Sequence, residues 1–291
     1  LTPTHRAGVC AFYGECGRNP EVNVSLVPSR VPCLSNTPAR VASEPLLSLL
    51  RSVCPELVRG DNETTRVCCT FSQLSALRFS VGLSGAVLAR CPACARNFAN
   101  IYCHNVCSPD QSLFTNVTRA VDYAAVPGSR AVLEYQLFYR RRYAEAAFAS
   151  CRDVQLPATG GYAIATMCGR YGAELCTAQR WLDFQGDKNN GLAPLQIDFH
   201  LLPNGSEPGQ GIAPLDAPVW SCDQAPDAEQ EPCSCQDCAR SCPPLVPPPG
   251  PPPPFLVGQA DGVLVICVLL FAGLALLFLA AVLCRRGSAE A

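Results

Sequence analysis

The chain has 291 residues, with 22 Lys and Arg against 24 Asp and Glu, 20 cysteines and three histidines. Because basic and acidic residues nearly balance, the composition lacks the net positive charge typical of nucleic-acid binding, and we expect no nucleic-acid partner. The length fits one large domain or two small ones.

Residues 1–242 are rich in cysteines and in glycosylation sequons. Eighteen of the cysteines lie between Cys10 and Cys242, an even number that allows nine disulfides. Predicted glycosylation sites are the four N-x-S/T sequons at Asn23, Asn62, Asn116 and Asn204. Both features indicate an oxidising lumen or the cell exterior. No leader is visible at Leu1, so we expect a mature form whose signal peptide has been removed.

Helical periodicity dominates these residues. Apolar residues recur with helical spacing over 46–57 and 71–81. Further helices are predicted in "RCPACARNFANIYCHNVC", in "AVLEYQLFYRRRYAEAAFASC" ending near Cys151, and in "TAQRWLDFQ". Partial alternation predicts strands in "SLFTNVTRAVDY" and "LQIDFHLL". The predicted fold class is α+β: a helix-rich, disulfide-stapled luminal or extracellular domain with a small mixed sheet.

The cysteines allow three interpretations. "CPAC" at 91–94 and "CQDC" at 235–238 have the spacing of a thioredoxin-type redox site, but neither lies in the βαβ context which that chemistry uses. "CSCQDCARSC" has enough thiolates for a zinc site. Because the compartment is oxidising, disulfides are favoured over both, and we expect no metal site. His104 is interpreted as structural, since no catalytic partner can be assigned to it from spacing.

The last fifth of the chain differs in composition from the rest. Residues 243–261 are proline-rich and predict an extended polyproline II linker. Residues 262–284 contain no charge and would span roughly 34 Å as a helix, enough to cross a bilayer. Arg285 and Arg286 open the short tail 285–291, so the positive-inside rule predicts a cytoplasmic tail and a luminal or extracellular N-terminal domain. The expected membrane is the plasma membrane or that of endosomes or lysosomes.

Six sequence blocks carry a resemblance to a known family. They are "GVCAFYGECG", the adjacent "CC" followed by "SQL", "RCPACARNF", "CSPDQSLFTNVT", "GDKNNGLAP" and "CSCQDC". In this order they resemble the N-terminal luminal domain of the Niemann-Pick type C cholesterol transporters, from about His5 through the membrane helix. "HRAGVCAFY", "RWLDFQGD" and "GLAPLQIDFHLL" look closer to the Niemann-Pick C-like intestinal sterol-uptake paralogue than to the lysosomal member.

The resemblance implies a domain, without enzymatic activity or cofactor, that binds cholesterol or an oxysterol in a preformed pocket. Gln73 is the implied hydroxyl partner, Leu77 a wall one turn further on, and Glu15 and Asn97 occupy polar positions of the same region. The other implied wall positions are Phe12, Phe98, Tyr102, Phe114, Phe148, Met167, Trp181, Phe184, Pro194, Leu195 and Ile197. The implied disulfides are Cys10–Cys68, Cys16–Cys33, Cys54–Cys103, Cys69–Cys107, Cys91–Cys233, Cys94–Cys151, Cys168–Cys176, Cys222–Cys238 and Cys235–Cys242.

The chain departs from the family pattern in two respects. Pro32 stands where the lysosomal member has an asparagine, so one hydroxyl partner is missing and sterol preference can differ. Full members continue into many more membrane helices, so the chain is either a fragment whose partners include those missing domains or a truncated form that binds sterol without transporting it. The alternative function is a cysteine-rich receptor or adhesion ectodomain that binds a protein partner.

Overall fold

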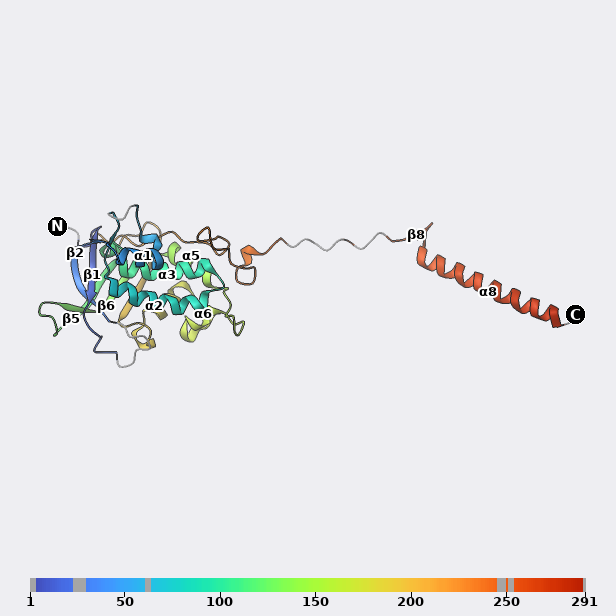
Figure 1. Cartoon of the computed structure of the whole chain (residues 1–291), viewed down its shortest axis with the longest axis horizontal. Helices are drawn as coiled ribbons and strands as arrows, with labels where there is room; N and C mark the ends of the chain where they lie inside the picture. Colours follow the sequence, from blue (N-terminus) through green and yellow to red (C-terminus); the bar gives the residue numbers. More distant parts are fainter. Residues whose placement is uncertain (1–3, 23–29, 61–63, 245–249, 251–253, 290–291) are drawn as a thin grey trace. The chain divides into compact units, whose positions relative to one another are not determined.

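The computed structural model describes residues 4–22, 30–60, 64–244, 250 and 254–289 (Figure 1). The predicted glycosylation sites Asn23 and Asn62 and most of the proline tract lie outside these residues. The chain divides into two compact units, Leu1–Pro243 and Pro244–Ala291. The first unit, which we call the N-terminal unit, contains nine disulfides and three clusters of buried apolar residues. It is therefore held together by its own contacts.

A mixed sheet organises the N-terminal unit. Its strands are β1 (Val9–Glu15), β2 (Pro32–Pro38), β5 (Thr115–Asp122), β6 (Arg130–Arg140) and β7 (Gln196–Leu202). The order is β1-β2-β6-β5, all antiparallel, and β7 pairs in parallel with β6. Two short strands, β3 (Arg40–Val41) and β4 (Arg66–Val67), form a separate ladder. The fold class is thus α+β with a small mixed sheet, as predicted.

Helices pack beside this sheet (Figure 1). They are α1 (Leu46–Val53), α2 (Phe71–Leu88), α3 (Pro92–Cys107), α4 (Gln111–Phe114), α5 (Arg141–Cys151), α6 (Ala163–Thr166) and α7 (Ala178–Gly186). Four 3₁₀ turns accompany them: η1 (Pro55–Leu57), η2 (Gly169–Tyr171), η3 (Lys188–Asn190) and η4 (Ala239–Ser241). A capping box in which Thr70 and Gln73 bond each other's backbone starts α2, and Pro92 occupies the first turn of α3.

The predicted helix over 131–151 is wrong in its first half. Residues 130–140 form β6, and only Arg141–Cys151 is helical. β6 lies inside the sheet, with β2, β5 and β7 as neighbours, and most of its side chains are buried on both faces. Such a strand has a continuous apolar sequence that periodicity cannot distinguish from a buried helix. The strands β1 and β2 were not predicted either.

Two clusters form most of the core. The larger cluster joins the sheet to α3, α5 and α7, and its largest fully buried side chains include Trp181, Tyr139 and Leu182. The second cluster joins α1, α2 and the end of α3 around Leu50 and Leu74. Tyr102 packs against both clusters, so α3 connects the two halves of the core.

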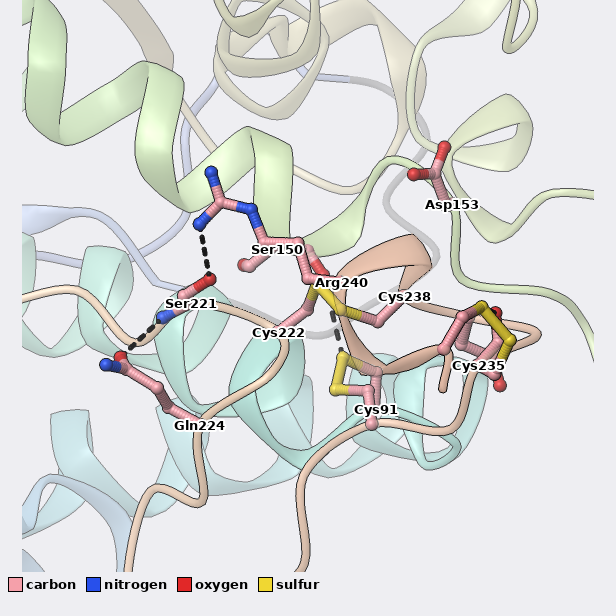
Figure 2. The surroundings of a disulfide bond; sticks show 12 residues. Cys91, Ser150, Asp153, Ser221, Cys222, Gln224, Cys235, Cys238 and Arg240 are labelled. Carbon is pink, nitrogen blue, oxygen red and sulfur yellow. Dashed lines mark hydrogen bonds between the residues drawn. A yellow bond between two sulfur atoms is a disulfide. The ribbon is translucent and has the colours of Figure 1, made fainter. Parts of the chain in front are cut away.

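The 18 cysteines of the N-terminal unit pair as the family resemblance implies. Four of the disulfides involve α3 or its N-cap: Cys91–Cys233, Cys94–Cys151, Cys103–Cys54 and Cys107–Cys69. Figure 2 shows the first of them beside Cys222–Cys238 and Cys235–Cys242, where the segment that precedes the linker folds against the start of α3. Each end of α3 is therefore linked covalently to a different part of the unit.

A buried carboxylate reinforces the junction at the start of α3. Asp237 has 1% of its surface exposed, and its Oδ2 accepts hydrogen bonds from Arg90 Nε and Ser234 Oγ, both at 2.9 Å. Its Oδ1 accepts from the backbone N–H of Gln155 at 2.8 Å. A charge buried this deeply is tolerated because an arginine and two further donors compensate its lost hydration.

In its described residues, the second unit has a short hairpin and one long helix. The hairpin pairs β8 (Leu256–Val257) with β9 (Ala260–Asp261), and α8 follows over Gly262–Ala289. Asp261 caps α8, since its Oδ1 accepts from the N–H groups of Val263 at 2.8 Å and Leu264 at 3.2 Å. Gly262–Arg285 is long and apolar enough to cross a membrane by length and composition.

Candidate functional site

The predicted hydroxyl partner Gln73 lies where β1 ends, β2 begins and α2 begins. Its side chain is 9% exposed. Its Oε1 accepts from the backbone N–H groups of Gly14 at 3.1 Å and Thr70 at 3.0 Å. Both donors are backbone amides, so the oxygen of the side-chain amide must face them, and the orientation of the Gln73 amide is fixed by the fold.

This orientation leaves the other end of the Gln73 amide available. Within the described residues, Nε2 makes no hydrogen bond to protein. An amide nitrogen has two donors, whereas its oxygen is already occupied here. Gln73 can therefore donate to an oxygen atom of a ligand without losing its contacts to β1 and α2.

Glu15 and Pro32 lie beside Gln73. They face each other across the β1–β2 ladder. Glu15 accepts a hydrogen bond from Ser72 Oγ at 3.1 Å and pairs with Arg30 at 3.5 Å. Pro32 is the first residue of β2, a position that tolerates the missing N–H. We call Glu15, Pro32, Ser72 and Gln73 the polar corner; Pro32 brings no side-chain donor to it.

Aromatic side chains from three helices form a second group. Trp181 of α7 has its ring centroid 5.8 Å from that of Phe98 and 5.9 Å from that of Phe148, which belong to α3 and α5. Phe98 in turn lies 5.2 Å from Tyr102, nearly edge to face. These four predicted wall residues, which we call the aromatic wall, are thus brought together by the helix packing.

The other predicted walls are distributed around the same cores. Phe12, Phe114, Met167, Leu195 and Ile197 belong to the larger cluster with most of the aromatic wall, and Leu77 belongs to the second. Phe184 and Pro194 are half-buried. Phe12 is held by Gln111, whose Oε1 accepts from its backbone N–H at 3.1 Å and whose Nε2 donates to the Asn105 carbonyl at 2.8 Å.

The walls are packed closely. Phe12, Leu77, Phe98, Phe114, Phe148, Met167, Trp181, Leu195 and Ile197 have exposed fractions between 0 and 9%. These predicted walls are therefore largely shielded from solvent. The preformed pocket that the resemblance implies stays a prediction.

Asn97 is fully engaged by protein. Its Oδ1 accepts from Trp220 N at 3.0 Å, and its Nδ2 donates to Ser150 Oγ at 2.8 Å and to the Trp220 carbonyl at 2.7 Å. It ties α3 to α5 and to the segment around Trp220. The structure thus gives Asn97 a role in holding the fold, and its hydrogen-bonding capacity is used there.

Two polar side chains shielded from solvent, one on α3 and one on α7, were missed by sequence reasoning. Asn100 of α3 is 2% exposed, and its Oδ1 has no hydrogen-bond partner in the described residues. Gln185 of α7 accepts a 2.8 Å hydrogen bond from the hydroxyl of Tyr102, whose pKa is raised by burial. Spacing alone gives little signal for either, because a polar residue in a helix is usually exposed.

His104 lies near the end of α3 and is not part of either group. Burial lowers the pKa of its imidazole to about 4, and the positive charge of Arg59 contributes in the same direction. Its Nδ1 has no hydrogen-bond partner among the described residues. The structure therefore favours the neutral ring.

This low pKa predicts a loss of stability in acid. Between pH 6.5 and 4 the unfolded chain binds a proton at His104 that the folded chain does not, so unfolding becomes easier as pH falls. We expect roughly 2 kcal/mol to be lost between pH 7.5 and pH 5. Urea denaturation of the N-terminal unit at both pH values measures this, and a His104→Gln variant should show a smaller loss. An equal loss in both proteins would assign it to other groups.

The redox and zinc interpretations find no support in the cysteines. Cys91 and Cys94 of "CPAC" are bonded to Cys233 and Cys151, and the two cysteines of "CQDC" are likewise in disulfides with other partners. Neither pair forms an internal CxxC disulfide. Across the described part of the chain, no group of three or more His, Cys, Asp or Glu side chains is arranged to hold a metal ion.

Comparison with known proteins identifies relatives along nearly the whole chain. Residues 7–262 match the family model described as Niemann-Pick C1 N terminus. The chain is 49% identical over 290 residues to the NPC1-like intracellular cholesterol transporter 1 of Mus musculus. This alignment covers 99% of the chain and 22% of the mouse protein. Identity to the Homo sapiens protein of that name is 49% over 272 residues, covering 92% of this chain and 20% of the relative.

More distant relatives match less closely. The NPC intracellular cholesterol transporter 1 of Sus scrofa is 33% identical over 261 residues, covering 88% of this chain and 19% of the relative. The higher identity to the NPC1-like proteins agrees with the motifs that predicted that branch. These relatives are named as transporters, not enzymes. The chain spans about a fifth of the length of the curated relatives it matches.

Proposed function

The chain belongs to the Niemann-Pick C1 N terminus family, NPC1-like branch, and on this premise we propose that its N-terminal unit binds one cholesterol or closely related sterol without chemical change. A sterol is a rigid apolar body with one hydroxyl group. It requires an apolar enclosure and a polar partner for that hydroxyl, because an unpaired buried hydroxyl is costly. The polar corner supplies the partner and the aromatic wall supplies apolar surface.

The observation that carries this proposal is the fixed amide of Gln73. Its oxygen is held by two backbone N–H groups, and its nitrogen makes no hydrogen bond within the described residues. This nitrogen is not among the fully buried polar atoms without a partner, so it is accessible to a ligand. A sterol hydroxyl oxygen could accept its hydrogen bond, and the hydroxyl hydrogen could be accepted by the Glu15 carboxylate or by water.

We infer that the walls, which are shielded from solvent, separate when a sterol enters. α3 is held at both ends by disulfides to Cys233, Cys151, Cys54 and Cys69, so we infer that it stays in place. α2 and α7 have no disulfide within their own lengths. The wall movement is therefore assigned to these two helices.

The chain is also proposed to be anchored in a membrane by α8. The nine disulfides fit a luminal or extracellular location for the N-terminal unit, and Arg285 fits a cytoplasmic tail. Among the predicted glycosylation sites, Asn204 is exposed and Asn116 half-buried. Transport of sterol across or into a membrane would involve the parts of the relatives that lie beyond the matched fifth of their length.

A titration tests the proposed function. The N-terminal unit, secreted with its disulfides formed, is titrated with radiolabelled cholesterol in competition with unlabelled 25-hydroxycholesterol. We expect saturable binding near one sterol per chain, and thermal protection that increases with ligand concentration. The relative order of the two sterols measures the effect of Pro32. A folded unit without saturable binding would contradict the proposal and favour an ectodomain that binds a protein partner.

Gln73→Ala should weaken sterol binding. The substitution removes the amide nitrogen, and the loss of one buried hydrogen bond is expected to reduce affinity roughly 10-fold, with a range of about 5- to 100-fold. It also removes half of the capping box of α2, which costs about 1 kcal/mol of stability by itself.

Thr70→Ala is the matched control. It removes the other half of the same capping box, the hydroxyl that accepts from Gln73 N at 3.3 Å and donates to Gln73 Oε1 at 3.3 Å. The Gln73 amide keeps its hydrogen bonds from the backbone N–H groups of Gly14 and Thr70. Its stability should fall by a similar amount while its sterol affinity stays near that of the unmodified protein. If both variants bind sterol equally well, Gln73 is not the hydroxyl partner.

A further inference from the structure

The outer face of α2 is apolar and exposed. Phe79 and Leu83, one turn apart, are 58% and 53% exposed. A hollow of about 400 Å³ lies between them and is lined by Ser75, Arg78 and Gly82 of the same helix. A surface helix normally directs polar residues outward, whereas α2 has apolar residues on both its inner and outer faces.

The packing of the N-terminal unit does not account for this face. A Cβ atom added to Gly82 or Gly85 would have no atom within 4 Å, so neither glycine is required by a neighbouring element. Each costs about 0.5–1 kcal/mol relative to alanine in a helix interior. Gly82 instead leaves the hollow open between Phe79 and Leu83. The two glycines destabilise the helix, and the apolar side chains beside them are exposed to water. Together these features indicate that this face makes a contact outside the unit.

We propose that the face formed by Phe79, Leu83 and Arg78 docks on the surface of a lipid bilayer. The hollow is lined by a single helix, so the face is shallow and suits a planar, deformable surface. Aromatic and leucine side chains beside a basic residue are the composition of helices that lie in the headgroup region. Arg78 is exposed and makes no ion pair in the described part of the chain, so its charge is available to anionic headgroups.

The length of the linker before α8 allows the N-terminal unit to reach the bilayer. Residues 243–261 connect the N-terminal unit to α8, and a linker of 19 residues can span at most about 65 Å. The unit thus remains within this distance of the bilayer in which α8 is proposed to lie, at a high effective lipid concentration. This argument rests on the proposed membrane anchor, but not on sterol binding.

The same helix connects the docking face to the candidate site. Gln73 and Leu77 are buried on the inner side of α2, while Phe79 and Leu83 are on its outer side. Contact with lipid would therefore occur on α2, the helix whose movement we assign to opening of the walls. The contact would also bring the candidate site close to the lipid bilayer, where sterols are dissolved.

Flotation with sterol-free vesicles tests the proposal. The N-terminal unit is mixed with phosphatidylcholine vesicles with and without phosphatidylserine, and the bound fraction is measured across lipid concentrations. The unmodified protein should bind, more tightly with phosphatidylserine. F79S/L83S should bind at least about 10-fold more weakly because most of the buried apolar area is lost. Arg78→Gln should lose only the gain from phosphatidylserine.

The control is V41S/V126S, which removes two valines that are 46% and 49% exposed outside α2. It should bind vesicles like the unmodified protein. The proposal is overturned if the unmodified protein does not float, or if F79S/L83S floats equally well. Sedimentation that shows an unmodified dimer and a monomeric F79S/L83S variant would assign the face to a second copy instead. Binding of cyclodextrin-solubilised cholesterol is measured separately, so failure of sterol binding and failure of lipid docking give different results.

Discussion

Replacing Cys91 and Cys233 together by alanine is expected to lower the free energy of unfolding of the N-terminal unit by roughly 4–5 kcal/mol. The bond joins residues 142 positions apart, the longest separation among the nine disulfides. A long cross-link restricts the unfolded chain more than a short one. Both cysteines are almost completely buried, at 0% and 1% exposed, so removal of the sulfurs also leaves a gap at the start of α3.

Chemical denaturation under non-reducing conditions measures this effect, and C235A/C242A provides the comparison. That second bond lies in the same segment but spans only 7 positions. Its removal should cost roughly 2–3 kcal/mol by the same chain-entropy argument. If the two double variants were equally destabilised, loop length would not be the main source of the stability that the Cys91–Cys233 bond provides.

Gly186→Ala should be the most destabilising change of a single glycine, at roughly 3 kcal/mol. Gly186 ends α7, and a Cβ atom there would lie 2.2 Å from the carbonyl oxygen of Ile197 in β7. That oxygen belongs to the backbone of β7, which pairs in parallel with β6, so it cannot move aside without disturbing the ladder. Trp181 and Phe184 of α7 are predicted wall residues, as is Ile197 of β7. The variant should therefore also lose sterol affinity.

The matched change is Gly82→Ala in α2. There the added methyl group meets nothing within 4 Å and the residue lies in a helix interior, so stability should rise by about 0.5–1 kcal/mol. Thermal melting of both variants beside the unmodified unit measures the contrast. A Gly186→Ala protein as stable as Gly82→Ala would mean that α7 can shift away from β7 at little cost.

Some of the candidate site follows from local sequence rules. The spacing of Thr70 and Gln73 is that of a capping box, so the start of α2 depends on only four neighbouring residues. The Gln73 amide is fixed only in part by this box, because Gly14 of β1 also donates to its oxygen. The helical spacing of Leu74 and Leu77 likewise predicts the buried face of α2. The helical spacing over 71–81 was predicted from the sequence, whereas the capping box was identified in the structure.

Other features depend on contacts between distant segments. Asn97 has an ordinary position in α3, and its role arises from Trp220, which lies 123 positions away. The partner of Gln185 is Tyr102, 83 positions away. Residues 131–140 form a strand because β5 and β7 cover both edges, which no local periodicity reveals. The burial of the walls is similarly a property of the assembled core.

The Cys91–Cys233 disulfide also affects the order in which the disulfides form during synthesis. Cys94 can meet Cys151 early, whereas Cys91 has to wait for a partner 142 residues downstream. At elongation rates of about 5–20 residues per second, the delay is roughly 7–30 s. During that interval Cys91 is a thiol three positions from Cys94, where mispairing competes, and a disulfide isomerase would correct it. The N-terminal unit can therefore complete its set of disulfides only after its last cysteines, Cys238 and Cys242, have been synthesised.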